Sequence, residues 1–267
     1  MKKGLKLLDD LVATGRNSVT PAWVMEHTGA SRQASVNLLG RLVEAGLLER
    51  VSRGHYAVRQ IGVLGTSAAS EDLALAVGAV FEGRPHRIAF RAALQYWGLL
   101  THPSLVVQVA SSARVGHRSL SGRPLKSVYE SPDTVAIDAV PLSNGAFISS
   151  RERALLECAE RPDLAGGIET VVEALTSGES FDIDRLKALA TELDAGPAIR
   201  RIGSLAEALK LEDLATGLEP MKPDTTTYVE LEPARSRSST ADEEARDREW
   251  GVKWRTSPEE LANVALQ

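Results

Sequence analysis

Residues 20–58 constrain the fold of this chain more than any other stretch of its sequence. Thr20 followed by Pro21 predicts the start of a helix, because a hydroxyl can cap free backbone N–H groups and proline tolerates the first helical position. Gly29 predicts the end of this helix in a tight turn. Trp23 is either a packing residue or a contact to phosphate. The residues that we expect the helix to turn toward the core are Val24, Met25 and Thr28.

A longer helix is predicted over residues 32–45, with Ser31 as its cap and Gly46 just beyond its end. Its expected buried stripe consists of Ala34, Leu38, Leu42 and Ala45. A hairpin is predicted next, with strands over 47–51 and 55–58 and a turn at Ser52-Arg53-Gly54. A further helix, over residues 3–13, precedes these elements and carries Leu5, Leu8, Leu11 and Val12 at helical spacing. This order of elements is that of the winged helix-turn-helix, which places one helix in the major groove of DNA and a basic hairpin beside it.

The outward face of the longer helix and the hairpin supply the candidate DNA contacts. Asparagine or glutamine can pair with adenine, and arginine with guanine or a phosphate. A basic hairpin grips the DNA backbone or the minor groove. The candidate residues are Arg32, Gln33, Val36, Asn37 and Arg41 on the helix and Arg50, Arg53 and His55 on the hairpin. Each of them can also be an ordinary solvated residue, and winged helices also occur as protein-binding modules.

Charge is distributed unevenly along the chain. The formal net charge of −5 alone argues against a nucleic-acid partner. Residues 1–60, however, hold nine Lys/Arg against five Asp/Glu, whereas residues 151–267 hold fifteen against twenty-five. A basic front and an acidic back are expected when one end of a chain meets phosphate.

Three observations bear on the compartment. No apolar run has the length that a membrane span needs. Asp9 and Asp10 interrupt the segment that would have to be the apolar part of a signal peptide. Cys158 is the single cysteine, which excludes an internal disulfide. We therefore expect a cytoplasmic protein with no membrane partner.

After a linker expected at residues 62–70, the sequence predicts both helices and strands. Helices are predicted over 71–81, within 84–98 and from about 149 to 217, with capping boxes at Ser149 and Glu152 and at Ser204 and Glu207. The predicted strands are 105–110, 126–129, 135–140 and 146–148. The expected fold class is therefore α+β, an N-terminal winged helix-turn-helix followed by a larger mixed α/β domain with a short central sheet enclosed by helices.

We expect three parts of the chain. Residues 1–60 would be the DNA-binding domain and residues 71–218 the α/β domain. Residues 219–267 are rich in Pro, Thr, Ser and alternating charge, which predicts a loosely ordered tail. Trp250 and Trp254 indicate that the end of this tail docks again as a strand and a short helix.

A run of basic residues without an acidic one extends over residues 84–126. It consists of Arg84, Arg87, Arg91, Arg114, Arg118, Arg123 and Lys126. Such a run can be a second nucleic-acid surface, a docking site for an acidic partner, or only solvated surface.

The sequence contains no constellation typical of an enzyme. The five histidines are dispersed, with no i, i+4 pair and no cysteine cluster for zinc. Asp133 and Asp138 lack the acidic-x-Lys element of a metal-dependent nuclease. Gly203-Ser204 ahead of Glu212-Asp213 fits a capped helix better than a nucleotidyltransferase site. We predict no catalytic residue, no metal and no cofactor.

Three stretches resemble the AbiE-type antitoxin family of type IV toxin–antitoxin systems. The first is the winged helix, with Ser31-Arg32, Gly46-Leu47-Leu48 and Arg53-Gly54-His55-Tyr56. The second is the helix end from Ala92-Ala93-Leu94 to Trp97-Gly98-Leu99. The third, which is the most specific, is Glu152-Arg153 before Leu155-Leu156, followed by Arg161-Pro162. From the residues alone, Glu152 can simply cap its helix and Arg153 can form an ion pair.

The resemblance implies an autorepressor that binds inverted repeats in its own promoter through the N-terminal domain. It also implies a C-terminal domain needed to counter a cognate nucleotidyltransferase-like toxin, by direct contact or indirectly. Two alternatives remain open: a stand-alone transcription factor whose C-terminal domain senses a ligand or partner, and an interaction protein whose winged helix binds protein.

Overall fold

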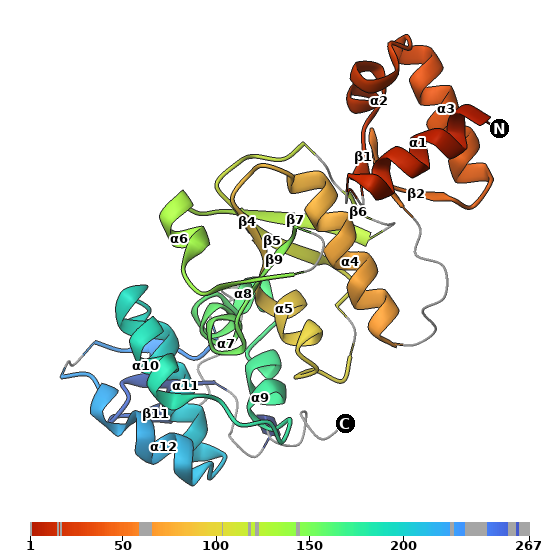
Figure 1. The fold of residues 1–267 in the computed structure, drawn as a ribbon. Helices are drawn as coiled ribbons and strands as arrows, with labels where there is room; N and C mark the ends of the chain where they lie inside the picture. The colour runs from red at the N-terminus through yellow and green to blue at the C-terminus, as the bar shows by residue number, and fades with distance from the viewer. Residues whose placement is uncertain are drawn as a thin grey trace. The chain divides into compact units, whose positions relative to one another are not determined.

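The structure, a computed structural model, describes residues 2–14, 16, 18–58, 66–102, 104–116, 119–120, 123–142, 145–224, 227–232, 245–255 and 260–261. The chain is a mixed α/β protein that divides into two compact units (Figure 1). The first unit consists of residues 1–88 and 105–148, and the second of residues 89–104 and 149–267. Because the chain passes three times between the units, their composition differs from the division at residues 61–70 expected from the sequence.

The first unit begins with three helices and a small antiparallel sheet. The helices are α1 (Lys2–Ala13), α2 (Pro21–Thr28) and α3 (Arg32–Glu44). The strands are β1 (Ser18–Val19), β2 (Leu48–Ser52) and β3 (His55–Val58), in the order β1-β3-β2. The predicted caps are confirmed: the Thr20 hydroxyl accepts from Trp23 N, the Ser31 hydroxyl accepts from Ala34 N, and Gly29 has a φ of +66° at the end of α2.

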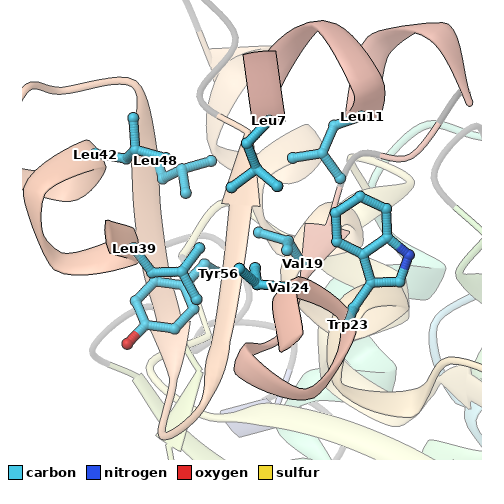
Figure 2. Packing of buried hydrophobic residues seen from close by; sticks show 9 residues of the cluster. All are labelled: Leu7, Leu11, Val19, Trp23, Val24, Leu39, Leu42, Leu48 and Tyr56. Atoms are coloured by element: carbon cyan, nitrogen blue, oxygen red, sulfur yellow. The ribbon is translucent and has the colours of Figure 1, made fainter. Parts of the chain in front are cut away.

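One apolar cluster holds these elements together (Figure 2). It consists of Leu7, Leu11, Val19, Trp23, Val24, Leu39, Leu42, Leu48 and Tyr56. Trp23 is only 8% exposed and stacks on His27 with ring centroids 3.9 Å apart, so it is a packing residue. Burying a side chain of this size stabilises the fold by about 2–3 kcal/mol.

The expected inner faces of the helices are partly wrong. In α3 the buried residues are Ser35, Leu39 and Leu42, whereas Ala34 and Ala45 are exposed and Leu38 is half-buried. α3 is rotated relative to the expected orientation because Leu39 and Leu42 fill the cluster. Ser35 tolerates burial because its hydroxyl donates to the Ser31 carbonyl at 3.0 Å. In α2 Met25 is 37% exposed and Thr28 is exposed, and in α1 Leu5 is 49% exposed.

The rest of the first unit is a six-stranded sheet with two helices. The strands are β4 (His86–Ile88), β5 (Val107–Ser111), β6 (Ser119–Leu120), β7 (Arg123–Tyr129), β8 (Ala139–Pro141) and β9 (Phe147–Ser149), in the order β6-β7-β5-β4-β9-β8. β4 pairs antiparallel with β5, whereas β4 with β9 and β5 with β7 are parallel.

Helices α4 (Thr66–Phe81) and α6 (Pro132–Ala136) cover opposite faces of this sheet (Figure 1). Consecutive side chains of a strand point to opposite faces. In β4 the His86 ring stacks on Phe81 of α4, and Arg87 donates to the Val135 carbonyl of α6. The core of this unit therefore lies on both faces of β4 and β5.

Several predicted elements change type in the first unit. Residues 84–98 contain a strand before the helix, and Ile88 lies in that strand rather than on a helix. The strand expected over 135–140 begins as the end of α6, because Ser131 caps a helix whose first position is Pro132, and only its last two residues lie in a strand, β8. The linker expected at 62–70 is helical from Thr66, and residues 59–65 lie outside the described residues.

The second unit is helical around α7 (Arg151–Glu160), in which every residue from Glu152 to Ala159 is buried. α7 packs against five other helices, so it forms the centre of the unit. They are α5, α8, α9, α10 and α11. The other helices are α5 (Phe90–Tyr96), α8 (Pro162–Ala165), α9 (Glu169–Leu175), α10 (Ile183–Glu192), α11 (Gly196–Ala208), α12 (Glu212–Leu218) and the 3₁₀ turn η1 (Glu219–Met221).

Neither predicted capping box forms. The cap of α7 is Ser150, whose hydroxyl accepts from Arg153 N at 3.1 Å, and the Glu152 carboxylate accepts from Asp182 N instead. Ser204 lies inside α11, and its hydroxyl donates to the Asp247 carboxylate at 2.6 Å.

The tail forms a docked three-stranded sheet from β10 (Val229–Glu230), β11 (Ala245–Asp247) and β12 (Val252–Trp254), in the order β10-β12-β11. Trp250 and Trp254 are buried, as the expected docking of a strand requires. The Trp250 indole N–H donates to Glu207 and the Trp254 indole N–H to Ser204, both on α11. The expected short helix near residue 257 and the charged segment 233–244 lie outside the described residues.

Candidate nucleic-acid interface

The outward face of α3 carries the polar residues that were predicted from the sequence as DNA contacts. Arg32, Gln33, Asn37 and Arg41 are exposed, and Val36 is 37% exposed. The Gln33 side-chain amide donates to the Asn37 Oδ1 at 2.9 Å, as i, i+4 residues of a helix can. Asn37 keeps its NH₂ group and a second lone pair on Oδ1, which are the donor and the acceptor that bidentate pairing with adenine needs.

The electrostatics of α2 and α3 favour an anion at their first turns. Neither first turn contains an acidic residue. Helix N-termini carry a partial positive charge, and their free N–H groups donate to phosphates. Arg32 adds a full charge at the first position of α3, and the only acidic residue of α3 is Glu44, at its last position.

The hairpin of β2 and β3 presents two of its three candidates. Arg50 and Arg53 are exposed, and Gly54 makes the turn with a φ of +81°. His55 is half-buried, and its Nδ1 lies 3.1 Å from the Ala79 carbonyl of α4. His55 therefore anchors the hairpin on α4, a long-range role that no local sequence signal indicates.

An open groove lies between the first turns of α2 and α3 and the hairpin turn. It has a volume of about 800 Å³ and is lined by Thr20, Pro21, Ala22, Met25, Glu26, Arg32, Gly54 and His55. Arg32 and His55 were predicted from the sequence as contacts, but the start of α2 was not. The Thr20-Pro21 start signal could have indicated this part of the groove, because a capped helix N-terminus is also an anion site.

The second group of basic residues does not form one surface. Arg87 is fully buried in the first unit, where it donates to Glu130 at 2.8 and 2.9 Å. Arg91 belongs to the second unit and donates to the Thr170 hydroxyl there. Arg84, Arg114 and Lys126 are exposed and Arg123 is half-buried, whereas Arg118 lies outside the described residues.

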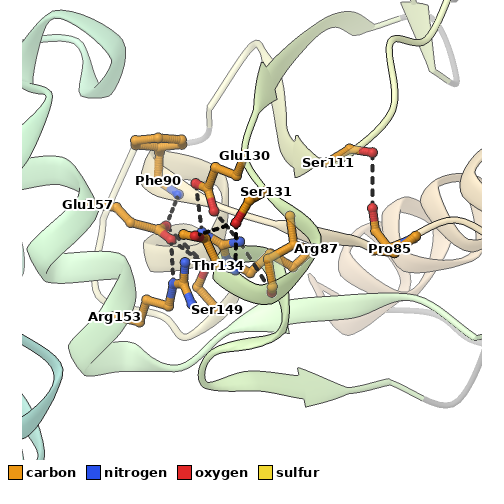
Figure 3. A network of polar contacts seen from close by, with 11 residues as sticks. Pro85, Arg87, Phe90, Ser111, Glu130, Ser131, Thr134, Ser149, Arg153 and Glu157 are labelled. Atoms are coloured by element: carbon orange, nitrogen blue, oxygen red, sulfur yellow. Dashed lines mark hydrogen bonds and ion pairs between the residues drawn. The ribbon is translucent and has the colours of Figure 1, made fainter. Parts of the chain in front are cut away.

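A buried polar cluster in the second unit was not predicted from the sequence (Figure 3). The Glu157 carboxylate accepts from Arg153 Nε at 2.9 Å, from the Ser149 hydroxyl at 3.0 Å and from the Phe90 backbone N–H at 3.0 Å. Phe90 has a φ of +55°, which is unusual for a residue with a side chain. Burial, with the Glu157 charge as a second cause, raises the pKa of the neighbouring Cys158 thiol well above its usual value. The buried thiol is therefore inert, and the cluster supports the fold.

Two further properties concern the described part of the chain. No group of three or more His, Cys, Asp or Glu side chains there has the geometry to hold a metal ion. None of the helices described combines the length and the apolar character of a membrane span.

Comparisons with known proteins identify the fold. No family model matches the chain, and no curated protein matches it. Among solved structures, it matches the crystal structure of the RV2827C protein from Mycobacterium tuberculosis with a TM-score of 0.61. The match covers 100% of this chain and 94% of that chain, at 15% sequence identity. The two chains share a fold. At 15% sequence identity, the structural similarity does not indicate a function.

Proposed function

We propose that this protein is a DNA-binding antitoxin and transcriptional autorepressor of a type IV toxin–antitoxin operon. Its first three helices and the hairpin would act as a winged helix-turn-helix on double-stranded operator DNA, with two copies on an inverted repeat. The second unit would be needed to counter a nucleotidyltransferase-like toxin, directly or indirectly.

The outward face of α3 is the observation that carries the DNA-binding part. It combines exposed Arg32, Gln33, Asn37 and Arg41 with a first turn that has no acidic residue. On the hairpin, Arg50 and Arg53 are exposed, where they can reach phosphates.

The antitoxin part rests on the three sequence stretches that resemble the AbiE-type family. The Arg153 of the most specific stretch lies in the buried cluster around Glu157, so this stretch supports the fold of the second unit rather than a contact site. A partner of this protein would be recognised elsewhere on its surface.

Mobility shift of the chain's own upstream DNA tests the DNA-binding part. We expect Arg32→Ala with Asn37→Ala to weaken binding at least about 30-fold, because each bidentate base contact contributes roughly 1–3 kcal/mol. Both residues are exposed, so the variant should keep its circular dichroism spectrum. Arg84→Ala, an exposed arginine of the same unit outside α3, is the matched control. An undiminished shift by the double variant would exclude α3 as the recognition helix.

Salt dependence tests the hairpin separately. Each phosphate contact that is lost should reduce the slope of log affinity against log salt by about 1. Arg50→Ala and Arg53→Ala should therefore each flatten the slope without changing sequence preference. Co-expression of the double α3 variant with the neighbouring gene product separates the two parts of the proposal. If this variant still neutralises the toxin but no longer represses its promoter, neutralisation requires only the second unit.

A stand-alone transcription factor with a ligand-sensing domain is the second candidate. It is favoured by a pocket of about 310 Å³ in the second unit, which has an apolar floor and an acidic rim. Its lining residues are Leu175, Gly178, Glu179, Ser180, Phe181, Ile183, Leu211, Glu212, Asp213 and Leu214. Operator binding that persists in a strain without a neighbouring nucleotidyltransferase-like gene would favour this candidate.

A further inference from the structure

His86 lies in a buried aromatic stack between α4 and the sheet of the first unit. It is the first residue of β4 and is 4% exposed. Its ring stacks on Phe81, the last residue of α4, with ring centroids 5.2 Å apart. It also lies nearly perpendicular to the Phe147 ring of β9, at a centroid distance of 5.9 Å. These ring contacts pack the last turn of α4 onto the sheet.

The two ring nitrogens of His86 have different surroundings. Nδ1 lies 2.8 Å from the Arg84 backbone carbonyl, which can only accept, so we assign the proton of the neutral ring to Nδ1. Nε2 is buried and has no hydrogen-bond partner among the described residues. A second proton would place a charge and an N–H donor there without an acceptor, which is unfavourable in a buried site. Burial, opposed by the Arg84 carbonyl, lowers the pKa of His86 below its usual 6.5.

The charged groups of α4 and of the turn that follows it do not compensate a protonated His86. Glu82, directly after α4, forms an ion pair with Arg16. The Arg84 side chain is exposed and has the same sign as an imidazolium. The two acidic residues of α4, Glu71 and Asp72, lie more than two turns before its last residue.

The sheet brings no compensating charge to this face either. Neither β5 nor β9, the two strands that pair with β4, contains a charged residue. Opposite His86 on β5 is Ser111, followed on β7 by Tyr129, which is 70% exposed. Arg87 points to the other face of the sheet, where it donates to Glu130.

The turn of α4 that His86 contacts also supports the hairpin. Nδ1 of His55 on β3 lies 3.1 Å from the carbonyl of Ala79, two residues before Phe81. α4 packs against β2 and β3 of the hairpin as well as against β4. A loss of packing at Phe81 would therefore act on the hairpin through the same turn of α4.

We propose that His86 is a pH-sensitive latch, a side chain that holds the last turn of α4 on the sheet while its ring is neutral and releases this turn when Nε2 is protonated. Release would also loosen the hairpin, because its contact with the Ala79 carbonyl lies on the released turn. The latch goes beyond the proposed function, since it concerns the pH at which the first unit keeps its structure. It does not depend on DNA binding.

Nuclear magnetic resonance of the natural protein, labelled at its histidine rings, measures the protonation directly. The His86 signal is assigned as the one that is absent from His86→Phe. We expect the pKa of His86 measured in this way to lie below its usual 6.5. This measurement needs no variant other than the one used for assignment.

Urea unfolding between about pH 5 and pH 8, the range in which histidine titrates, measures the effect on stability. The unfolded chain takes up the proton first, so this contribution to stability is complete above pH 6.5 and is lost as the pH falls toward the lowered pKa of the folded state. The equilibrium constant for unfolding should therefore rise below pH 6.5 by up to about tenfold for each pH unit, since one proton is bound.

Two variants that cannot take up this proton isolate the contribution of His86. His86→Phe keeps an aromatic ring between Phe81 and Phe147. His86→Asn keeps an NH₂ group that can donate to the Arg84 carbonyl, and it serves if the phenylalanine variant fails to fold. Both should lack the tenfold component of the pH dependence. His102→Asn, which replaces a histidine whose side chain is 70% exposed, is the matched control and should retain it.

Hydrogen exchange locates the released segment. The natural protein and His86→Phe are compared at the same pH, so that the intrinsic exchange rates cancel. At about pH 5.5 the amides of the last turn of α4 and of the hairpin should exchange faster in the natural protein, whereas at about pH 7.5 the two proteins should exchange alike.

Three outcomes would overturn the inference. They are a pKa of His86 at or above 6.5, the same pH dependence of unfolding in the natural protein and in a folded non-titrating variant, and acid-induced exchange that spares α4 and the hairpin. All three are measured without DNA. A failure of the latch therefore leaves the proposed function untouched, and a failure to bind the promoter does not count against the latch.

Discussion

Replacing Glu157 by glutamine should destabilise the second unit strongly. Its carboxylate is 8% exposed and compensates the charge of Arg153, whose side chain is 2% exposed. Glutamine has nearly the same shape, but it removes the negative charge and can turn an NH₂ group toward the donors on Arg153 and Phe90. Breaking a buried ion pair from one side costs about 3–5 kcal/mol, because the remaining buried charge loses the opposite charge that compensates it.

Urea denaturation followed by tryptophan fluorescence measures this loss. The Trp97 indole N–H donates to the Ser149 carbonyl at 2.8 Å, so a reporter lies in the same unit beside the cluster. Glu192→Gln on α10 removes an exposed carboxylate and is the matched control. It should change the free energy of unfolding by no more than about 0.5 kcal/mol.

A double substitution separates the buried charge from packing. Arg153→Met with Glu157→Leu removes both charges while keeping apolar volume, and such replacements of buried pairs are often neutral or stabilising. We therefore expect the double variant to be more stable than Glu157→Gln alone. The reasoning is refuted if Glu157→Gln costs less than about 1 kcal/mol, or if the double variant is as unstable as the single one.

Two further predictions concern the second unit. Gly203→Ala should loosen the docked tail, because an added Cβ would lie 2.4 Å from the Trp250 ring. We expect a cost of about 1–3 kcal/mol and faster proteolysis of the tail, whereas Gly196→Ala in the same helix, which has open space, should be harmless. Thr101→Val should make stability less dependent on pH. Burial by itself would raise the pKa of Glu173, but hydrogen bonds from the Thr101 hydroxyl and backbone hold it below its usual 4.5. A lowered folded-state pKa gives stability that is complete above pH 4.5 and is lost as the pH falls through the folded-state pKa. The difference in urea midpoint between the natural protein and Thr101→Val should shrink over that window. Thr191→Val should show no such change, because the Thr191 hydroxyl donates to the Lys187 carbonyl within α10.

The ends of the N-terminal helices could be predicted because their signals are local. Thr20, Ser31 and Gly29 act on backbone groups within four residues of themselves, and so does the turn at Gly54. The inner face of α3 could not be predicted equally well. Its apolar positions allow two rotations, and the choice depends on how Leu39 and Leu42 meet side chains of α1 and the hairpin.

The capping boxes failed for the opposite reason, since the partners of their residues are distant in sequence. Ser204 was expected to cap a helix, but its hydroxyl donates to Asp247, 43 residues away. Glu152 was expected to bond its own helix, but it accepts from Asp182 N, 30 residues away. A motif of four residues predicts a cap only where no stronger partner folds onto it.

The basic run over residues 84–126 shows how far charge in the sequence can indicate a site. Arg87 and Arg91 donate to acceptors within different units, Arg87 as a fully buried side chain and Arg91 as a half-buried one. Arg123 is half-buried like Arg91, whereas Lys126 is exposed. A run of like charge in a sequence therefore establishes neither a single surface nor a partner, because burial and internal acceptors decide which of its side chains reach solvent.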